Sequence, residues 1–144
     1  MTNPASGGTD GPVTELTPEE SWELLGGERL GRLVVSVSDR IDVFPVNYVA
    51  HQGKLLFRTA EGTKLVGLTI QQQVAFEVDH VSEGLGWSVV VHGAARRLQT
   101  SAEIAAADEL PLQSWVPTPK YNYVEITPKE ITGRRFAFGA EPQQ

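Results

Sequence analysis

The residues best suited to bind an anionic group lie in the segment FRTAEGTKL, which starts at Phe57. Arg58 supplies a guanidinium fork, Thr59 a hydroxyl and Lys64 an ammonium group, and the intervening loop contains a glycine. A phosphate group prefers this set of donors, and a helix that begins near Lys64 would add the partial positive charge of its N-terminus. The alternative is a solvated arginine and lysine on either side of a turn.

A second candidate segment is PVNY, in which Pro45, Val46 and Asn47 lie inside a predicted strand. Proline removes one hydrogen bond from a strand ladder. The strand is therefore at a sheet edge, bulged, or facing a ligand at this point. In the ligand case, the neighbouring backbone groups would face a flat molecule, and the Asn47 amide would both donate and accept hydrogen bonds. In the other case, the proline protects an edge strand from aggregation.

The third candidate segment is GWSVVVHG, in which Trp87 stands at the start of a strand. Its indole is suited to stack on an aromatic ring, to pack in a dimer interface or to cover the end of a barrel. The Ser88 hydroxyl is suited to bond a phosphate.

Other kinds of chemistry find little support in the sequence. There are no cysteines, so thiolate catalysis and cysteine-ligated zinc are excluded. His51, His80 and His92 lack the short helical spacing of a zinc site, and we expect no metal. No Ser-His-Asp arrangement can be picked out, and we assign no catalytic side chain.

Short strands separated by turns must position these segments. The apolar pattern predicts strands at residues 31–37, 41–49, 54–59, 74–78, 87–98, 121–126 and 129–138. Short helices are expected from Thr17, from Lys64 to Ile70, and from Ser101 to Glu109, with Thr17 and Ser101 as N-caps. Gly93 marks a bulge or a bend. The fold class is mainly β, an antiparallel barrel or sandwich with few short helices.

Length and composition indicate one domain in 144 residues. We expect a disordered tail at 1–15, a cofactor-binding domain at 16–138 and a second tail at 139–144. The net charge of −6 is atypical of nucleic-acid binding. No apolar run is long enough to span a membrane, and the N-terminus lacks the features of a signal peptide. A soluble, cytoplasmic protein is expected.

In order, PVNY, FRTAEGTKL, VAFEVD and GWSVVVHG resemble the pyridoxamine 5′-phosphate oxidase-like flavoproteins, in particular their short bacterial branch. The resemblance covers Thr17 to Leu98 well and the rest loosely. It implies the FMN-binding split β-barrel fold and a homodimer with two cofactor sites at the subunit interface.

By this resemblance, Arg58 and Lys64 hold the cofactor phosphate with help from Thr59. Pro45, Val46 and Asn47 would lie along the flavin ring. Trp87 and Ser88 would come from the partner subunit. FMN is the expected cofactor, because Arg58 and Lys64 suit a single terminal phosphate; F420 and haem are the alternatives.

The implied function is an FMN-dependent oxidoreductase that transfers hydride to or from a small molecule, with the chemistry supplied by the cofactor. The alternatives are an F420-dependent reductase and a non-catalytic dimer that binds flavin, F420 or haem. The Arg-x-His substrate motif of true pyridoxamine phosphate oxidases is missing, since the chain reads Gly133-Arg134-Arg135-Phe136 near its end. We therefore do not expect oxidation of pyridoxamine phosphate.

Overall fold

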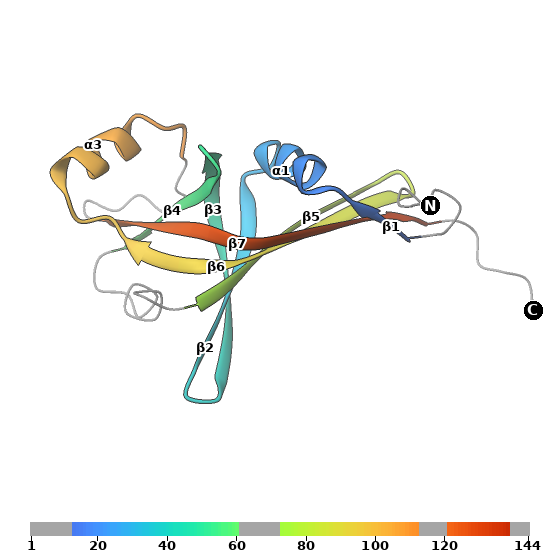
Figure 1. The fold of residues 1–144 in the computed structure, drawn as a ribbon, viewed down its shortest axis with the longest axis horizontal. Helices are drawn as coiled ribbons and strands as arrows, with labels where there is room; N and C mark the ends of the chain where they lie inside the picture. Colours follow the sequence, from blue (N-terminus) through green and yellow to red (C-terminus); the bar gives the residue numbers. More distant parts are fainter. Residues whose placement is uncertain (1–12, 61–72, 113–120, 139–144) are drawn as a thin grey trace, which may run out of the picture.

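A computed structural model describes residues 13–60, 73–112 and 121–138 (Figure 1). The strands among them are β1 (Val13–Leu16), β2 (Leu30–Val37), β3 (Arg40–His51), β4 (Lys54–Ala60), β5 (Gln73–Ser82), β6 (Leu85–Arg97) and β7 (Tyr121–Ala137). The helices among them are α1 (Pro18–Gly26) and α3 (Ser101–Asp108). β1 pairs with β7, so the ordered chain begins before residue 16 and the expected tail boundary was too late. The expected helix at 64–70 and the C-terminal tail at 139–144 lie outside the described residues.

The strands form a ring, which confirms the predicted split barrel. The sheet order is β1-β7-β4-β3-β2-β5-β6, and an additional β6–β7 pairing closes the ring. All of the strand pairs are antiparallel. Closure depends on the length of β7, which pairs with β6 along one side and with β4 and then β1 along the other.

β7 is one continuous strand, so the prediction of two strands at 121–126 and 129–138 was wrong. The pairing with β6 shifts from His92–Glu130 to Gly93–Pro128, which leaves Lys129 as the extra residue of a bulge. A Cβ at Gly93 would collide with the Thr127 carbonyl group, so glycine is required there. The bulge accommodates Pro128 and lets one strand continue where the sequence suggested a break. The predicted irregularity at Gly93 is confirmed, although the extra residue of the bulge lies opposite it on β7.

The β2–β3 hairpin projects from the rest of the sheet (Figure 1). Its turn is at Ser38 and Asp39, which both have positive φ. β3 pairs with β2 from Arg40 to Asn47, but with β4 only from Tyr48 to His51. The first two thirds of β3 therefore have no β4 partner.

Helix α1 begins as predicted, with a capping box between Thr17 and Glu20, and ends at Gly27. Its Leu25 is fully buried in the main core, and the Tyr48 hydroxyl donates a 2.6 Å hydrogen bond to the Leu25 carbonyl oxygen. Burial, with a smaller contribution from Glu28, raises the pKa of Tyr48, so the phenol stays protonated. The bond ties α1 to β3 at the point where β3 meets β4.

The core has two parts. The main core fills the ring and is made by Leu25, Leu33, Val35, Tyr48, Leu55, Phe57, Val74, Phe76, Val78, Val89, Val91, Ala95, Val124 and Ile126. The second, smaller cluster joins α3 to the outside of β4 and β7, through Leu56, Leu98, Ala107 and Tyr123. The Tyr123 hydroxyl also bonds Asp108 at 2.5 Å.

Helix α3 is capped by Thr100, not by Ser101 as we expected. The Thr100 hydroxyl accepts from the Glu103 amide at 3.1 Å, and the Glu103 carboxylate accepts from the Thr100 amide at 3.3 Å. The other Glu103 oxygen binds Arg96 of β6 at 2.5 Å. The third position after the cap requires Glu or Gln for this reciprocal pair, and only Thr100 has Glu103 at that spacing.

The capping of α3 predicts an acid-sensitive helix. The hydrogen bond from Arg96, followed by those from Thr100 and Gln99, lowers the pKa of Glu103 to about 2 from an ordinary value of 4.5. The stabilisation is present above the ordinary pKa and is lost as pH falls toward 2. Unfolding midpoints of the wild type and Glu103→Gln would be measured from pH 7 to pH 2. The wild type should have the higher midpoint at pH 7, and the difference between the two should shrink below pH 4.5. A constant difference across this range would contradict the assignment.

Candidate functional site

Pro45, Val46 and Asn47 lie on the part of β3 that has no β4 partner. Val46 packs against the main core, whereas Pro45 is exposed and Asn47 is half-buried. Pro45 stands opposite Arg32 of β2 and has no partner on β4. The N–H group that proline lacks is therefore not needed for a ladder with β4. The edge interpretation of this proline is confirmed, and the backbone beside it is free of β4 pairing.

Arg58 and Thr59 lie near the end of β4 and project to opposite faces of the strand. Thr59 is buried, and its Oγ1 has no hydrogen-bond partner among the described residues. Arg58 is half-buried on the outer face, opposite Tyr123 of β7. Lys64 lies outside the described residues. The described chain therefore does not bring the two β4 side chains together around one phosphate group.

Asn47 and Arg58 lie on either side of the point where β3 separates from β4. The last pair of that ladder is Tyr48 with Phe57, and both of these side chains are buried in the main core. The next residue on each strand, Asn47 and Arg58, therefore projects to the outer face. We call the place defined by Pro45, Asn47 and Arg58 the strand fork. It combines an amide, a guanidinium group and a strand edge that has no partner among the described residues.

Trp87 and Ser88 lie near the start of β6. Trp87 is half-buried and packs against the main core. Ser88 projects to the outer face, where its hydroxyl is 3.4 Å from Glu77 Oε2. Ser88 also lines a hollow of about 160 Å³ with Val90, His92, Thr132 and Arg134.

An ion-pair network that the sequence analysis missed joins Ser88 to the strand fork. Arg32 of β2 pairs with Glu77 at 2.6 Å and Asp79 at 2.8 Å, both on β5. Arg32 lies between Pro45 and Glu77 in the sheet register. The chain of neighbours thus runs across the outer face from Pro45 to Ser88. The sequence signal was limited to the charges of Glu77 and Asp79 on alternate residues of one strand, and it did not say that Arg32 lies on the neighbouring strand.

Burial is the main reason that the pKa of Glu77 is raised, and the hydrogen bond with Asp79 adds to it. Arg32 opposes the rise without cancelling it. Glu77 can therefore retain a proton more readily than a separate, exposed carboxylate. Within the described residues, no three acidic or histidine side chains are grouped closely enough to hold a metal ion. In the same part of the chain, no helix has the length and apolar character to cross a membrane.

Comparison with known proteins identifies relatives. The family model described as pyridoxamine 5′-phosphate oxidase matches residues 17–135. A Mycobacterium smegmatis FAD-binding protein is 44% identical, with a TM-score of 0.81 over 88% of this chain and 100% of its own. A Corynebacterium glutamicum protein named as a candidate pyridoxamine 5′-phosphate oxidase is 48% identical, with a TM-score of 0.86 over 93% of this chain and 100% of its own. An uncharacterised Mycobacterium tuberculosis protein is 45% identical over 94 residues, 65% of this chain and 86% of that protein.

Proposed function

The chain belongs to the pyridoxamine 5′-phosphate oxidase family, and from this premise we propose that it is a flavin-dependent oxidoreductase acting on a small molecule by hydride transfer. The observation that carries the proposal is the strand fork. An open strand edge beside Pro45 offers backbone groups to a flat polar ring, and Asn47 and Arg58 project to the same face. A bound flavin would supply the hydride chemistry, while the protein holds and orients it.

The residues at the strand fork suit a flavin nucleotide. Asn47 and the free backbone edge of β3 match the hydrogen-bonding rim of the ring, and Arg58 matches a phosphate group. In this proposal Lys64 completes the phosphate contacts with Arg58, and Trp87 and Ser88 reach the cofactor from the partner subunit; the buried Thr59 faces away from Arg58 and takes no part.

We favour FMN, because Arg58 and Lys64 suit one terminal phosphate. FAD is the first alternative, since the Mycobacterium smegmatis relative is named for FAD binding. F420 follows, because it also carries a phosphate and an acidic tail that basic residues could contact. Haem is the least favoured, since the strand fork offers Asn47 and Arg58 rather than an iron ligand.

Equilibrium titration of the purified protein with FMN, FAD, F420 and haem, followed by absorbance and flavin fluorescence, tests the proposal. We expect saturable binding of a flavin nucleotide at micromolar concentration, with quenching of its fluorescence. If none of the four binds, the oxidoreductase and the binding-protein interpretations both fail.

A non-catalytic flavin-binding dimer is the second candidate, since the relative at 44% identity is named for binding rather than for a reaction. Turnover separates the two candidates. The flavin-loaded protein would be mixed with NAD(P)H or reduced F420 and a panel of quinones, nitro compounds and enones. Oxidation of the donor that requires an acceptor supports an enzyme, and binding without turnover supports the second candidate.

The proposed homodimer predicts a role for the projecting β2–β3 hairpin. Ile41 and Val43 are 68% and 57% exposed, and such apolar side chains favour a protein interface. Val43→Asp should shift the protein from dimer to monomer in sedimentation velocity, because a buried carboxylate is costly. Gln52→Asp, which adds the same charge at an exposed polar position in the turn of the β3–β4 hairpin, is the control and should leave the distribution unchanged. A monomeric wild type, or dimers in both variants, would contradict this interface.

A further inference from the structure

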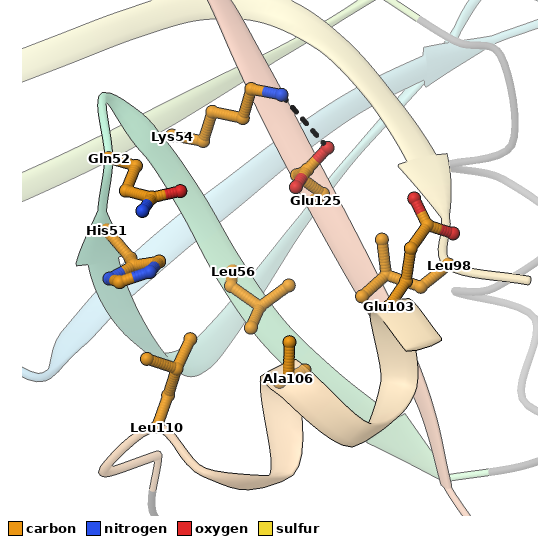
Figure 2. Close-up of a pocket in the computed structure, with 10 residues that line it drawn as sticks. His51, Gln52, Lys54, Leu56, Leu98, Glu103, Ala106, Leu110 and Glu125 are labelled. Atoms are coloured by element: carbon orange, nitrogen blue, oxygen red, sulfur yellow. Dashed lines mark ion pairs between the residues drawn. The ribbon is translucent and has the colours of Figure 1, made fainter. Parts of the chain in front are cut away.

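The pocket beneath α3 and the hollow beside Ser88 differ in how their charged groups are used. The pocket has a volume of about 190 Å³ and lies between α3, the β3–β4 hairpin and β7 (Figure 2). Its Glu125 pairs with Lys54, as Figure 2 shows, and its Glu103 pairs with Arg96. The hollow has a volume of about 160 Å³, and no carboxylate is among the described residues that line it. The hollow, rather than the pocket, offers uncompensated positive charge to a ligand.

The β6–β7 ladder places the side chains that line the hollow. Ser88 stands opposite Arg134, and Val90 stands opposite Thr132. Opposite residues of an antiparallel pair project to the same face, and His92 projects there too because it is two residues beyond Val90. The hollow therefore combines one apolar side chain with a guanidinium group, two hydroxyls and an imidazole.

Arg134 carries the positive charge of this hollow. The residue is exposed, and it forms no ion pair with any of the described residues, including Glu15, which stands opposite it on β1. The planar guanidinium fork is suited to bind two oxygens of one anion. The lining of the hollow therefore favours an anionic ligand.

The carboxylates on the neighbouring strand are engaged elsewhere. Glu77 and Asp79 of β5 both pair with Arg32, at 2.6 and 2.8 Å. Glu130 of β7 is 4.0 Å from His92, but its side chain is 65% exposed, so solvent and salt screen its charge. These groups weaken the attraction of the hollow for an anion without cancelling it.

The number of donors favours a phosphate group over a carboxylate. Arg134 alone can satisfy both oxygens of a carboxylate, whereas a phosphate group has further oxygens for the Ser88 and Thr132 hydroxyls. The hydrogen bond from Ser88 to Glu77 is long, at 3.4 Å, so this hydroxyl can rotate toward a ligand. A cavity of about 150 Å³ holds benzene, so the hollow is too small for a nucleotide. We infer that the hollow binds the phosphate group of a small ligand.

Titration of the ¹⁵N-labelled, flavin-free protein with sodium phosphate tests the inference. Sodium chloride keeps the ionic strength constant, so that screening alone causes no shift. We expect saturable NMR shifts at Ser88, Thr132 and Arg134, and roughly fivefold or more tighter binding of phosphate than of acetate. Equal affinity for acetate, shifts located elsewhere, or shifts that do not saturate would overturn the inference.

Two arginine variants make the test specific. Arg134→Ala should weaken phosphate binding roughly tenfold or more, because a charge-assisted contact is lost. Arg135→Ala is the matched control: Arg135 stands opposite Trp87, which packs against the main core, so it projects to the other face of β7. Its loss should leave phosphate binding nearly unchanged. Equal losses in the two variants would indicate general attraction to positive charge and would overturn the site.

Two further titrations identify the source of the phosphate group and separate the hollow from the proposed flavin site, with which it shares only Ser88. Tighter binding of methyl phosphate than of inorganic phosphate would support a monoester as the ligand, and weaker binding would support the free ion. Arg134→Ala should leave the Kd for a flavin nucleotide unchanged. If it weakens flavin and phosphate binding equally, the hollow is part of the cofactor site and the inference fails. If the wild type binds no flavin, the proposed function fails, and the phosphate titration still decides the inference.

Discussion

Replacing Phe76 by alanine should lower the free energy of unfolding by about 3–5 kcal/mol. Phe76 of β5 is fully buried in the main core. The centroid of its aromatic ring lies 5.2 Å from that of Tyr48, in an edge-on arrangement, and 6.3 Å from that of Phe57, in a stacked one. Phe76 therefore links three strands of the barrel, β5, β3 and β4. It also presses on the backbone of Gly31, where no Cβ would fit. Truncation would leave a cavity among strands that the closed ring prevents from collapsing.

Urea unfolding followed by circular dichroism measures this effect. Phe138→Ala is the matched control, because that ring is 54% exposed and should cost about 1 kcal/mol or less. If the two variants unfold at the same urea concentration, the core does not depend on Phe76 in the way that the packing indicates.

Local features of the fold were predictable from the sequence. The Thr17 N-cap and the strand predicted at 31–37 rest on neighbours within a few residues, and both are confirmed. The α3 cap was predictable as well, because Thr100 and Glu103 have the spacing of a capping box. The prediction of Ser101 as the N-cap did not take that spacing into account.

Features that depend on distant strands were not predictable. The continuity of β7 through Pro128 depends on Gly93, which lies on another strand and leaves space for the bulge at Lys129. The Arg32–Glu77 pair joins residues 45 positions apart, and only the sheet order makes them neighbours. The pocket beneath α3 likewise depends on where the helix packs. Periodicity reports which face a residue occupies, but not which strand lies beside it.

The candidate site depends both on local sequence pattern and on the pairing of distant strands, so it was predictable only in part. The sequence indicated an edge, a bulge or a ligand at Pro45, and the structure confirms the edge by showing where β4 pairing stops. It did not indicate that Asn47 and Arg58 flank the same point. Conversely, it grouped Arg58 with Thr59, although adjacent strand residues project to opposite faces.

Arg58 is therefore the residue whose loss should affect cofactor binding most. In Arg58→Ala, flavin binding should weaken by about 1.5–3 kcal/mol, or roughly 10- to 150-fold in Kd, because a charge-assisted contact with the phosphate is lost. Arg58→Lys should lose less affinity than Arg58→Ala, because lysine keeps the positive charge although it lacks the guanidinium fork. Fluorescence titration with the cofactor that the wild type binds measures all three constants.

Two comparisons make the result specific to the phosphate. Arg97→Ala removes another half-buried arginine, paired with Val124 in the ladder, and should leave Kd unchanged. Riboflavin has the same ring as FMN without the phosphate, so its affinity should hardly respond to Arg58→Ala. An equal loss for riboflavin and FMN would mean that Arg58 supports the fold of the site rather than the phosphate. A Kd unchanged for both would remove Arg58 from the site, and with it the reason for placing the cofactor at the strand fork.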